Sequence, residues 1–153
     1  MDSNDRANKA KQSFLSGCNC PQSVVSAFSD VFEEHGIDVQ TAMRMASPFG
    51  GGMGRLREVC GAVSGMLMVL GLLEGYADVS DYDAKKDLYA HVQTLAERFR
   101  AENGSILCRE LLGLSEGPDS SAPERRSDEY YERRPCPELV ASAARILEEY
   151  LGG

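Results

Sequence analysis

Five cysteines give this chain most of its potential for chemistry, because a thiolate can act both as a nucleophile and as a metal ligand. They are Cys18, Cys20, Cys60, Cys108 and Cys136. Proline follows Cys20 and Cys136 and favours the first helical position, so these two are expected as N-cap residues, and Cys108 is expected in a first helical turn. The helix dipole stabilises a thiolate there. The pattern indicates activated thiols, although any single cysteine could simply be a small buried hydrophobic residue.

A glycine-rich loop and an apolar helix are predicted to position these thiols. The loop contains four glycines, which can adopt left-handed backbone angles: Gly50, Gly51, Gly52 and Gly54. The chain then becomes almost wholly apolar, which predicts a buried central helix from about Leu56 to Leu73. Cys60 lies near the start of this helix, where the other cysteines are expected to converge.

The remaining elements are also predicted to be helical. Apolar residues recur at helical spacing and no useful β-like alternation is present, so we expect one all-α domain over residues 1–153, with about six or seven helices around the central one. The segment from about 115 to 134 is rich in Gly, Pro, Ser and charge, which predicts a flexible surface loop. Its mixed charge run, Glu124 to Arg134, is expected to be solvated.

Three motifs and two later cysteines together resemble one protein family. The motifs are G-x-N-C followed by Q-S-V (Gly17 to Val24), F-G-G-G-M-G (Phe49 to Gly54) and C-G-A-V-S-G (Cys60 to Gly65). The combination resembles the redox-active proteins named for their C–GCAxxG–C–C signature. The resemblance covers nearly the whole chain.

The resemblance implies a redox role for four signature cysteines, which fall on Cys20, Cys60, Cys108 and Cys136. Cys18 lies outside that pattern. Some members are described as selenoproteins, which implies redox chemistry at one or more of these positions, and some are encoded near transporter genes.

Two chemistries fit four convergent cysteines. Dithiol pairs could cycle through a disulfide, as in a thiol–disulfide oxidoreductase, with Cys20 or Cys136 attacking and buried Cys60 resolving. We hypothesise that Cys20 and Cys60 form one functional pair, with Cys108 and Cys136 beside them. The same four cysteines could instead bind zinc or an iron–sulfur cluster. Their wide spacing differs from that of zinc fingers and ferredoxins, so dithiol chemistry without a cofactor is favoured.

A non-catalytic module that binds a small ligand is the third interpretation. The glycine loop precedes the central helix and could hold an anion on its backbone N–H groups. Arg55 and Arg57 could assist. This interpretation predicts slow and uniform thiols, whereas redox function predicts one or two fast ones at neutral pH.

Composition excludes several classes of partner. The formal net charge of −8 disfavours binding to nucleic acid or to an anionic membrane.

The apolar run that ends at Leu73 is shorter than the roughly 18 to 20 residues of a spanning helix. The N-terminus has no apolar run of the secretory type, so a cytoplasmic location is expected. The sequence identifies no redox partner, and its glycine-rich faces would suit a homodimer.

Overall fold

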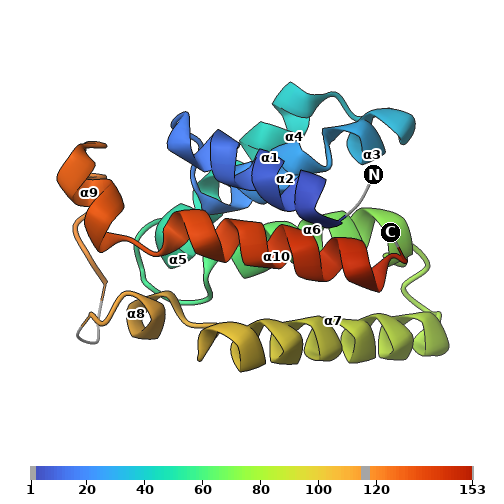
Figure 1. Cartoon of the computed structure of the whole chain (residues 1–153). Coiled ribbons are helices and arrows are strands. Elements are labelled where there is room, and N and C mark those ends of the chain that lie inside the picture. Colours follow the sequence, from blue (N-terminus) through green and yellow to red (C-terminus); the bar gives the residue numbers. More distant parts are fainter. Residues whose placement is uncertain (1–2, 115–117, 153) are drawn as a thin grey trace.

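The computed structural model describes residues 3–114 and 118–152, and the regular elements named in these ranges are all helices (Figure 1). The longer helices are α1 (Ser3–Leu15), α2 (Cys20–Ala27), α4 (Val39–Ala46), α6 (Gly61–Glu74), α7 (Tyr82–Asn103) and α10 (Cys136–Tyr150). The shorter ones are α3 (Ser29–Glu34), the 3₁₀ helix η1 (Ser47–Phe49), α5 (Gly50–Met53), α8 (Cys108–Leu111) and α9 (Asp128–Arg133). The predicted all-α class is confirmed, and the short helices α5, α8 and α9 accompany the longer ones.

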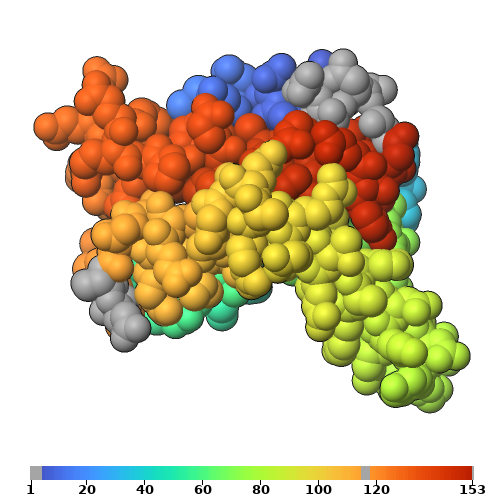
Figure 2. All heavy atoms as spheres, turned by 60° about the horizontal axis from the view of Figure 1, so that its bottom comes forward, coloured from blue at the N-terminus to red at the C-terminus, as the bar shows by residue number. Residues whose placement is uncertain are grey.

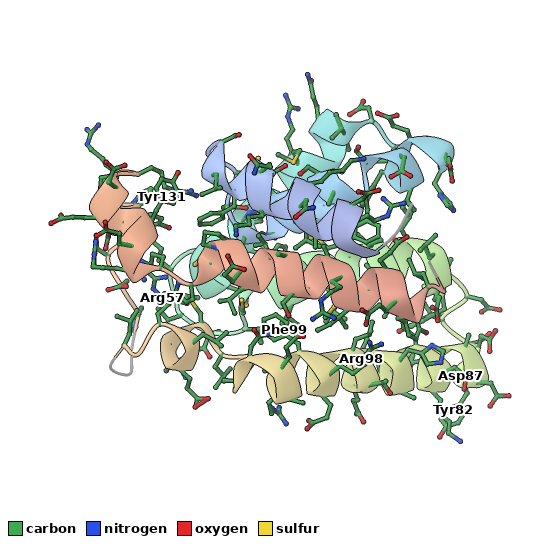
Figure 3. All side chains as sticks on the ribbon, viewed as in Figure 1. Arg57, Tyr82, Asp87, Arg98, Phe99 and Tyr131 are labelled. Carbon is green, nitrogen blue, oxygen red and sulfur yellow. The ribbon has the colours of Figure 1, made fainter. Side chains whose placement is uncertain are left out.

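The core lies where α10 and α6 run through the molecule. α10 packs along α1 on one side and against α7 on the other, and α6 packs against α2 (Figure 1). One face of α10 is apolar and fully or almost fully buried, with Val140, Ala143 and Leu147 at helical spacing. Phe99 of α7 is buried and points into the space between α7 and α10 (Figure 3). These contacts fix the position of the first turn of α10.

The central helix begins later than its hydrophobic pattern predicts. α6 starts at Gly61, whereas the sequence favours a start near Leu56. Arg55 and Arg57 have positive φ angles of 69° and 61°, which no right-handed helix accommodates. Two residues after Arg57, Val59 forms an antiparallel bridge with Leu107, so the chain is not yet helical there.

Two predicted caps are also displaced by one position. Asn19 caps α2: its side chain accepts from the Gln22 N–H, and the Gln22 side chain accepts from the Asn19 N–H. Cys20 is therefore the first residue inside α2 rather than its N-cap. In the same way Pro135 precedes α10, and Cys136 is the first residue of that helix. Both cysteines stay within the first turn, where the dipole argument applies.

The turn between α6 and α7 projects from the body of the molecule together with the first part of α7 (Figure 2). Val79 and Tyr82 are largely exposed there. The homodimer that the glycine-rich faces suggest stays a prediction. Among the helices of residues 3–114 and 118–152, none combines the length and the hydrophobicity that crossing a bilayer requires.

Candidate functional site

The four signature cysteines line one pocket of about 270 Å³. Cys20, Cys108 and Cys136 are the first residues of α2, α8 and α10, and Cys60 immediately precedes α6. All four side chains are buried, with exposures of at most 9%, and none forms a disulfide. Cys18 is half-buried and is not among the residues that line the pocket. The structure thus brings together the four residues that the resemblance singles out, each at the start of a different helix.

The C-G-A-x-x-G motif places Cys60 beside α2. A Cβ atom on Gly61 would lie 2.6 Å from Cδ of Pro21 and 2.9 Å from Cβ of Cys20, both closer than real Cβ contacts. A Cβ on Gly65 would lie 2.8 Å from the Pro21 carbonyl oxygen. The two glycines therefore allow the first turns of α2 and α6 to touch, and this contact brings Cys20 next to the start of α6.

The glycine-rich loop forms a left-handed turn. Gly51, Gly52 and Gly54 have φ angles of 70°, 68° and 60°, and Met53 and Arg55 continue the same hand. Glycine adopts these angles without the steric cost of a side chain, whereas each non-glycine residue there costs about 1–3 kcal/mol. The predicted loop glycines Gly50, Gly51, Gly52 and Gly54 all line the pocket.

The turn holds the cysteine of α8 in place. A Cβ on Gly52 would lie 2.7 Å from Cβ of Cys108, so only glycine leaves room for that side chain. Two backbone hydrogen bonds secure the same region: the Cys60 N–H donates to Ile106 O at 2.7 Å, and the Cys108 N–H donates to Glu58 O at 2.6 Å. These bonds fix the backbones of Cys60 and Cys108 relative to each other.

Residues 118–134, hereafter the covering segment, line one side of the pocket. Arg126 donates to Phe14 O and to Cys18 O, each at 2.9 Å, and its guanidinium lies 4.1 Å from the centre of the Phe14 ring. Tyr131 on α9, labelled in Figure 3, donates to Leu15 O. The part of the chain predicted as a loop thus contains a helix and is anchored to α1. Its predicted flexibility stays untested.

A second set of contacts joins the covering segment to the glycine loop. The Asp119 N–H donates to Arg55 O at 2.9 Å, and Arg57 Nε donates to the Asp119 carboxylate at 2.8 Å. Arg57 Nη1 also lies 3.5 Å from Cys108 Sγ. Figure 3 shows Arg57 at the end of the molecule that carries α5, α8 and the start of α10.

Arginines surround the thiols even though the protein as a whole is acidic. Arg55, Arg57, Arg126 and Arg134 line the pocket, whereas Glu124 is the only acidic side chain among its described lining residues. The Arg134 side chain is 9% exposed and donates to Glu124 at 3.0 Å, while its buried Nε has no hydrogen-bond partner. Sequence reasoning assigned Arg134 and Glu124 to a solvated charge run. It missed Arg126 and Arg134 because nothing local to the sequence shows that these two side chains line a pocket.

These charges act unequally on two neighbouring thiols. A hydrogen bond from Cys20 and the positive charges of Arg134, Arg126 and Arg57 lower the pKa of Cys136 below its usual 9.0, although burial opposes them. Donating that hydrogen bond and being buried raise the pKa of Cys20 well above the ordinary value. Of the two thiols, Cys136 therefore loses its proton more readily, and Cys20 holds its proton more firmly.

The other two thiols of the pocket hold their protons. Burial raises the pKa of Cys60 to about 12, although the backbone N–H groups of Ala62 and Val63 at the start of α6 oppose that rise. Burial also raises the pKa of Cys108, and the neighbouring Arg57 opposes that rise. Sequence reasoning paired Cys20 with Cys60, and that functional pair stays a prediction. The interaction that contributes most to the pKa shifts of Cys20 and Cys136 joins these two thiols.

The metal alternative finds no preformed site in this geometry. Within the two described ranges, no group of three or more His, Cys, Asp or Glu side chains is placed to hold a metal ion. Cys20, Cys60, Cys108 and Cys136 nevertheless share one pocket.

The comparisons with known proteins agree with the sequence resemblance. The family model described as "Putative redox-active protein (C_GCAxxG_C_C)" matches residues 18–150, which include all five cysteines. Among curated proteins and solved structures, no significant match to this chain was found.

Proposed function

This chain belongs to the C_GCAxxG_C_C family of redox-active proteins, and on that premise we propose that it is a dithiol–disulfide redox protein. Cys136 is the attacking thiol and Cys20 is the resolving thiol. One observation carries the proposal: Cys20 and Cys136 share a pocket lined by arginines, where the Cys20 thiol and the arginine charges lower the pKa of Cys136. A thiolate is the reactive form in thiol–disulfide exchange.

The exchange proceeds in two steps. The Cys136 thiolate attacks one sulfur of a substrate disulfide, the substrate S–S bond breaks, and the first leaving thiolate takes the proton of Cys20. The new Cys20 thiolate then attacks the Cys136 sulfur of the mixed disulfide, and the second substrate thiolate departs. The substrate is reduced by two electrons, and the two cysteines are oxidised to one disulfide.

The raised pKa of Cys20 suits a resolving thiol, because it stays protonated until Cys136 has reacted. The proton that Cys20 releases then goes to the leaving thiolate, which departs as a neutral thiol. Cys60 is less suited to attack, because burial raises its pKa to about 12 and leaves almost no thiolate at neutral pH.

Mapping the bond that forms tests the proposal. The reduced protein is treated with one equivalent of bis(2-hydroxyethyl) disulfide, unfolded in iodoacetamide and analysed by peptide mass spectrometry. We expect a Cys20–Cys136 disulfide, with Cys60 and Cys108 alkylated. The Cys20→Ser variant should stop at a mixed disulfide on Cys136, the Cys136→Ser variant should form neither product, and the Cys18→Ser variant should match the parent.

Two results would overturn the assignment. A disulfide between another pair would move the attacking role, and uniformly slow thiols would favour the non-catalytic binding module. Native mass spectrometry of protein purified without oxygen tests the ligand alternative. Extra mass equal to zinc or an iron–sulfur cluster, lost when Cys136 is replaced by serine, would assign the cysteines to metal binding instead.

A further inference from the structure

We propose that the substrate of this pocket is a small anionic disulfide, and that Arg126 and Arg134 bind its negatively charged ends. The inference rests on the proposed dithiol function and adds the chemical class of the molecule on which it acts. Three observations carry it: the burial of the cysteines in a small pocket, the excess of positive charge in its lining, and a buried arginine nitrogen without a hydrogen-bond partner in the described residues.

The burial of the cysteines and the size of the pocket favour a small molecule as substrate. Cys136 is 8% exposed, and Cys20 is 9% exposed. The covering segment lines one side of the pocket and is anchored through Arg126 to α1 and to the backbone before α2. A disulfide in a folded protein would have to reach sulfur atoms of two residues that are at most 9% exposed. The pocket volume of about 270 Å³ lies just below the roughly 300–1,000 Å³ of ordinary small-ligand pockets, so the pocket suits a small molecule.

The charge of the pocket selects for an anion. Most of its arginines are partly neutralised, because Arg55 and Arg57 pair with Asp119, and Arg134 pairs with Glu124. Arg126 differs, since its partners in the described residues are two carbonyl oxygens and the Tyr131 hydroxyl rather than a carboxylate. A positive cavity in a protein of net charge −8 concentrates anions at the thiols and repels cations from them.

Arg134 offers a position for a carboxylate. Its Nε is buried and bonds to nothing in the described residues, although its Nη2 bonds to Glu124. A buried donor without a partner is costly, so a ligand oxygen that accepts from it is stabilised. Arg134 lies two positions before Cys136 and is one of the charges that act on that thiol. A carboxylate held there brings the rest of a short substrate to the attacking sulfur.

The electron balance needs no further reagent in this half-reaction. The anionic disulfide is the oxidant, its S–S bond is cleaved, and it leaves as two anionic thiols. One of these carries the proton of Cys20, and the other leaves as a thiolate. The Cys20–Cys136 disulfide holds the oxidising equivalents.

Three disulfides of similar length that carry negative, zero or positive charge test the inference. The probes are 3,3′-dithiodipropionate, which is dianionic, bis(2-hydroxyethyl) disulfide, which is neutral, and cystamine, which is dicationic. Stopped-flow mixing with the reduced protein gives the second-order rate constant for the loss of the Cys136 thiolate. We expect the anionic probe to react at least about tenfold faster than the neutral one and the cationic probe to be slowest, as Coulomb interactions at pocket distances allow.

Arginine variants identify the groups responsible. Arg134→Gln should also lower the reactivity of Cys136 itself, but that effect is common to all three probes. The readout is therefore the ratio of the rate constant for the anionic probe to that for the neutral probe. The ratio should fall toward one in Arg134→Gln and in Arg126→Gln, and Arg134→Lys should restore part of it. Arg133→Gln is the matched control, because Arg133 also pairs with Glu124 but is 60% exposed and outside the pocket.

The outcomes separate the inference from the function on which it rests. Equal rates for the three probes, with the Cys20–Cys136 bond still formed, would overturn the anionic substrate and leave the dithiol function in place. An equal loss of the ratio in Arg133→Gln would reduce the effect to overall charge and would also overturn the inference. Failure of every probe to produce the Cys20–Cys136 bond would overturn the dithiol function itself. Circular dichroism of each variant identifies one that has failed to fold.

Discussion

The contact between α2 and α6 can be tested with a single methyl group. In Gly61→Ala the new Cβ would approach Pro21 Cδ to 2.6 Å and Cys20 Cβ to 2.9 Å. Gly71→Ala is the matched control, because Gly71 lies in the same helix and a Cβ there meets nothing within 4 Å. The two substitutions therefore add the same methyl group to the same helix, Gly61 at its first position and Gly71 in its interior, and only the methyl group at position 61 meets neighbouring atoms.

The expected stabilities have opposite signs. Alanine gains up to about 1 kcal/mol over glycine in a helix, and Gly71→Ala should retain most of that gain. Gly61→Ala adds overpacking, which typically costs about 1–3 kcal/mol, so its net effect should be destabilising. The variant should also displace Cys20 and weaken the hydrogen bond to Cys136, which would raise the pKa of Cys136.

Urea unfolding followed by circular dichroism measures the first effect, and the pH dependence of iodoacetamide labelling at Cys136 measures the second. The free energy of unfolding should be lower in Gly61→Ala than in Gly71→Ala by about 2 kcal/mol or more. If the two variants are equally stable, or if Gly61→Ala leaves labelling at Cys136 unchanged, the role assigned to the motif is wrong.

Three further predictions concern individual side chains. The labelling rate of Cys136 should reach half its maximum at a pH below the ordinary thiol pKa of 9.0. Cys20→Ala should raise this midpoint pH. Cys20→Ser should raise it less, because the serine hydroxyl can still donate a hydrogen bond to Cys136. The folded protein keeps the Cys60 proton up to a pKa of about 12, whereas the unfolded chain releases it near 9.0, so the free energy of unfolding should fall as pH rises between these values. Urea titrations across that range should show a smaller fall in Cys60→Ala, and an equal fall would assign it to other groups. Arg126→Ala should speed amide hydrogen exchange in the covering segment roughly tenfold or more, because charged hydrogen bonds are lost. Arg125→Ala, at the exposed neighbouring position, should match the parent. Unchanged exchange in Arg126→Ala would show that other contacts hold the segment.

Local patterns predicted the helices and the starts at which the cysteines lie. The Cys-Pro pairs at Cys20 and Cys136 mark helix beginnings because proline suits a first turn, and the structure places both cysteines there. The apolar run after Val59 predicted the helix that became α6. Its early start was predicted wrongly because composition does not reveal the left-handed angles of Arg55 and Arg57.

Partners across the fold could not be predicted in the same way. The hydrogen bond between Cys20 and Cys136 depends on where α2 and α10 meet, and no periodicity in either helix encodes that meeting point. Arg134 belongs to a run of mixed charge that is typical of a solvated loop, yet its side chain is nearly buried. The sequence contains the groups of the site, and only the packing of the chain selects which of them become neighbours.

The positions of Cys20 and Cys136 along the chain connect the redox state of the protein to its folding. A bond between them would close a loop of about a hundred residues, which the chain-entropy treatment values at about 4–5 kcal/mol against the unfolded state. By thermodynamic linkage, native structure must favour that disulfide by the same amount relative to an unfolded chain. At about 30 mV for each 1.4 kcal/mol, folding alone makes the couple roughly 100 mV more reducing. The distance in sequence between the two helix starts is therefore one determinant of the reduction potential.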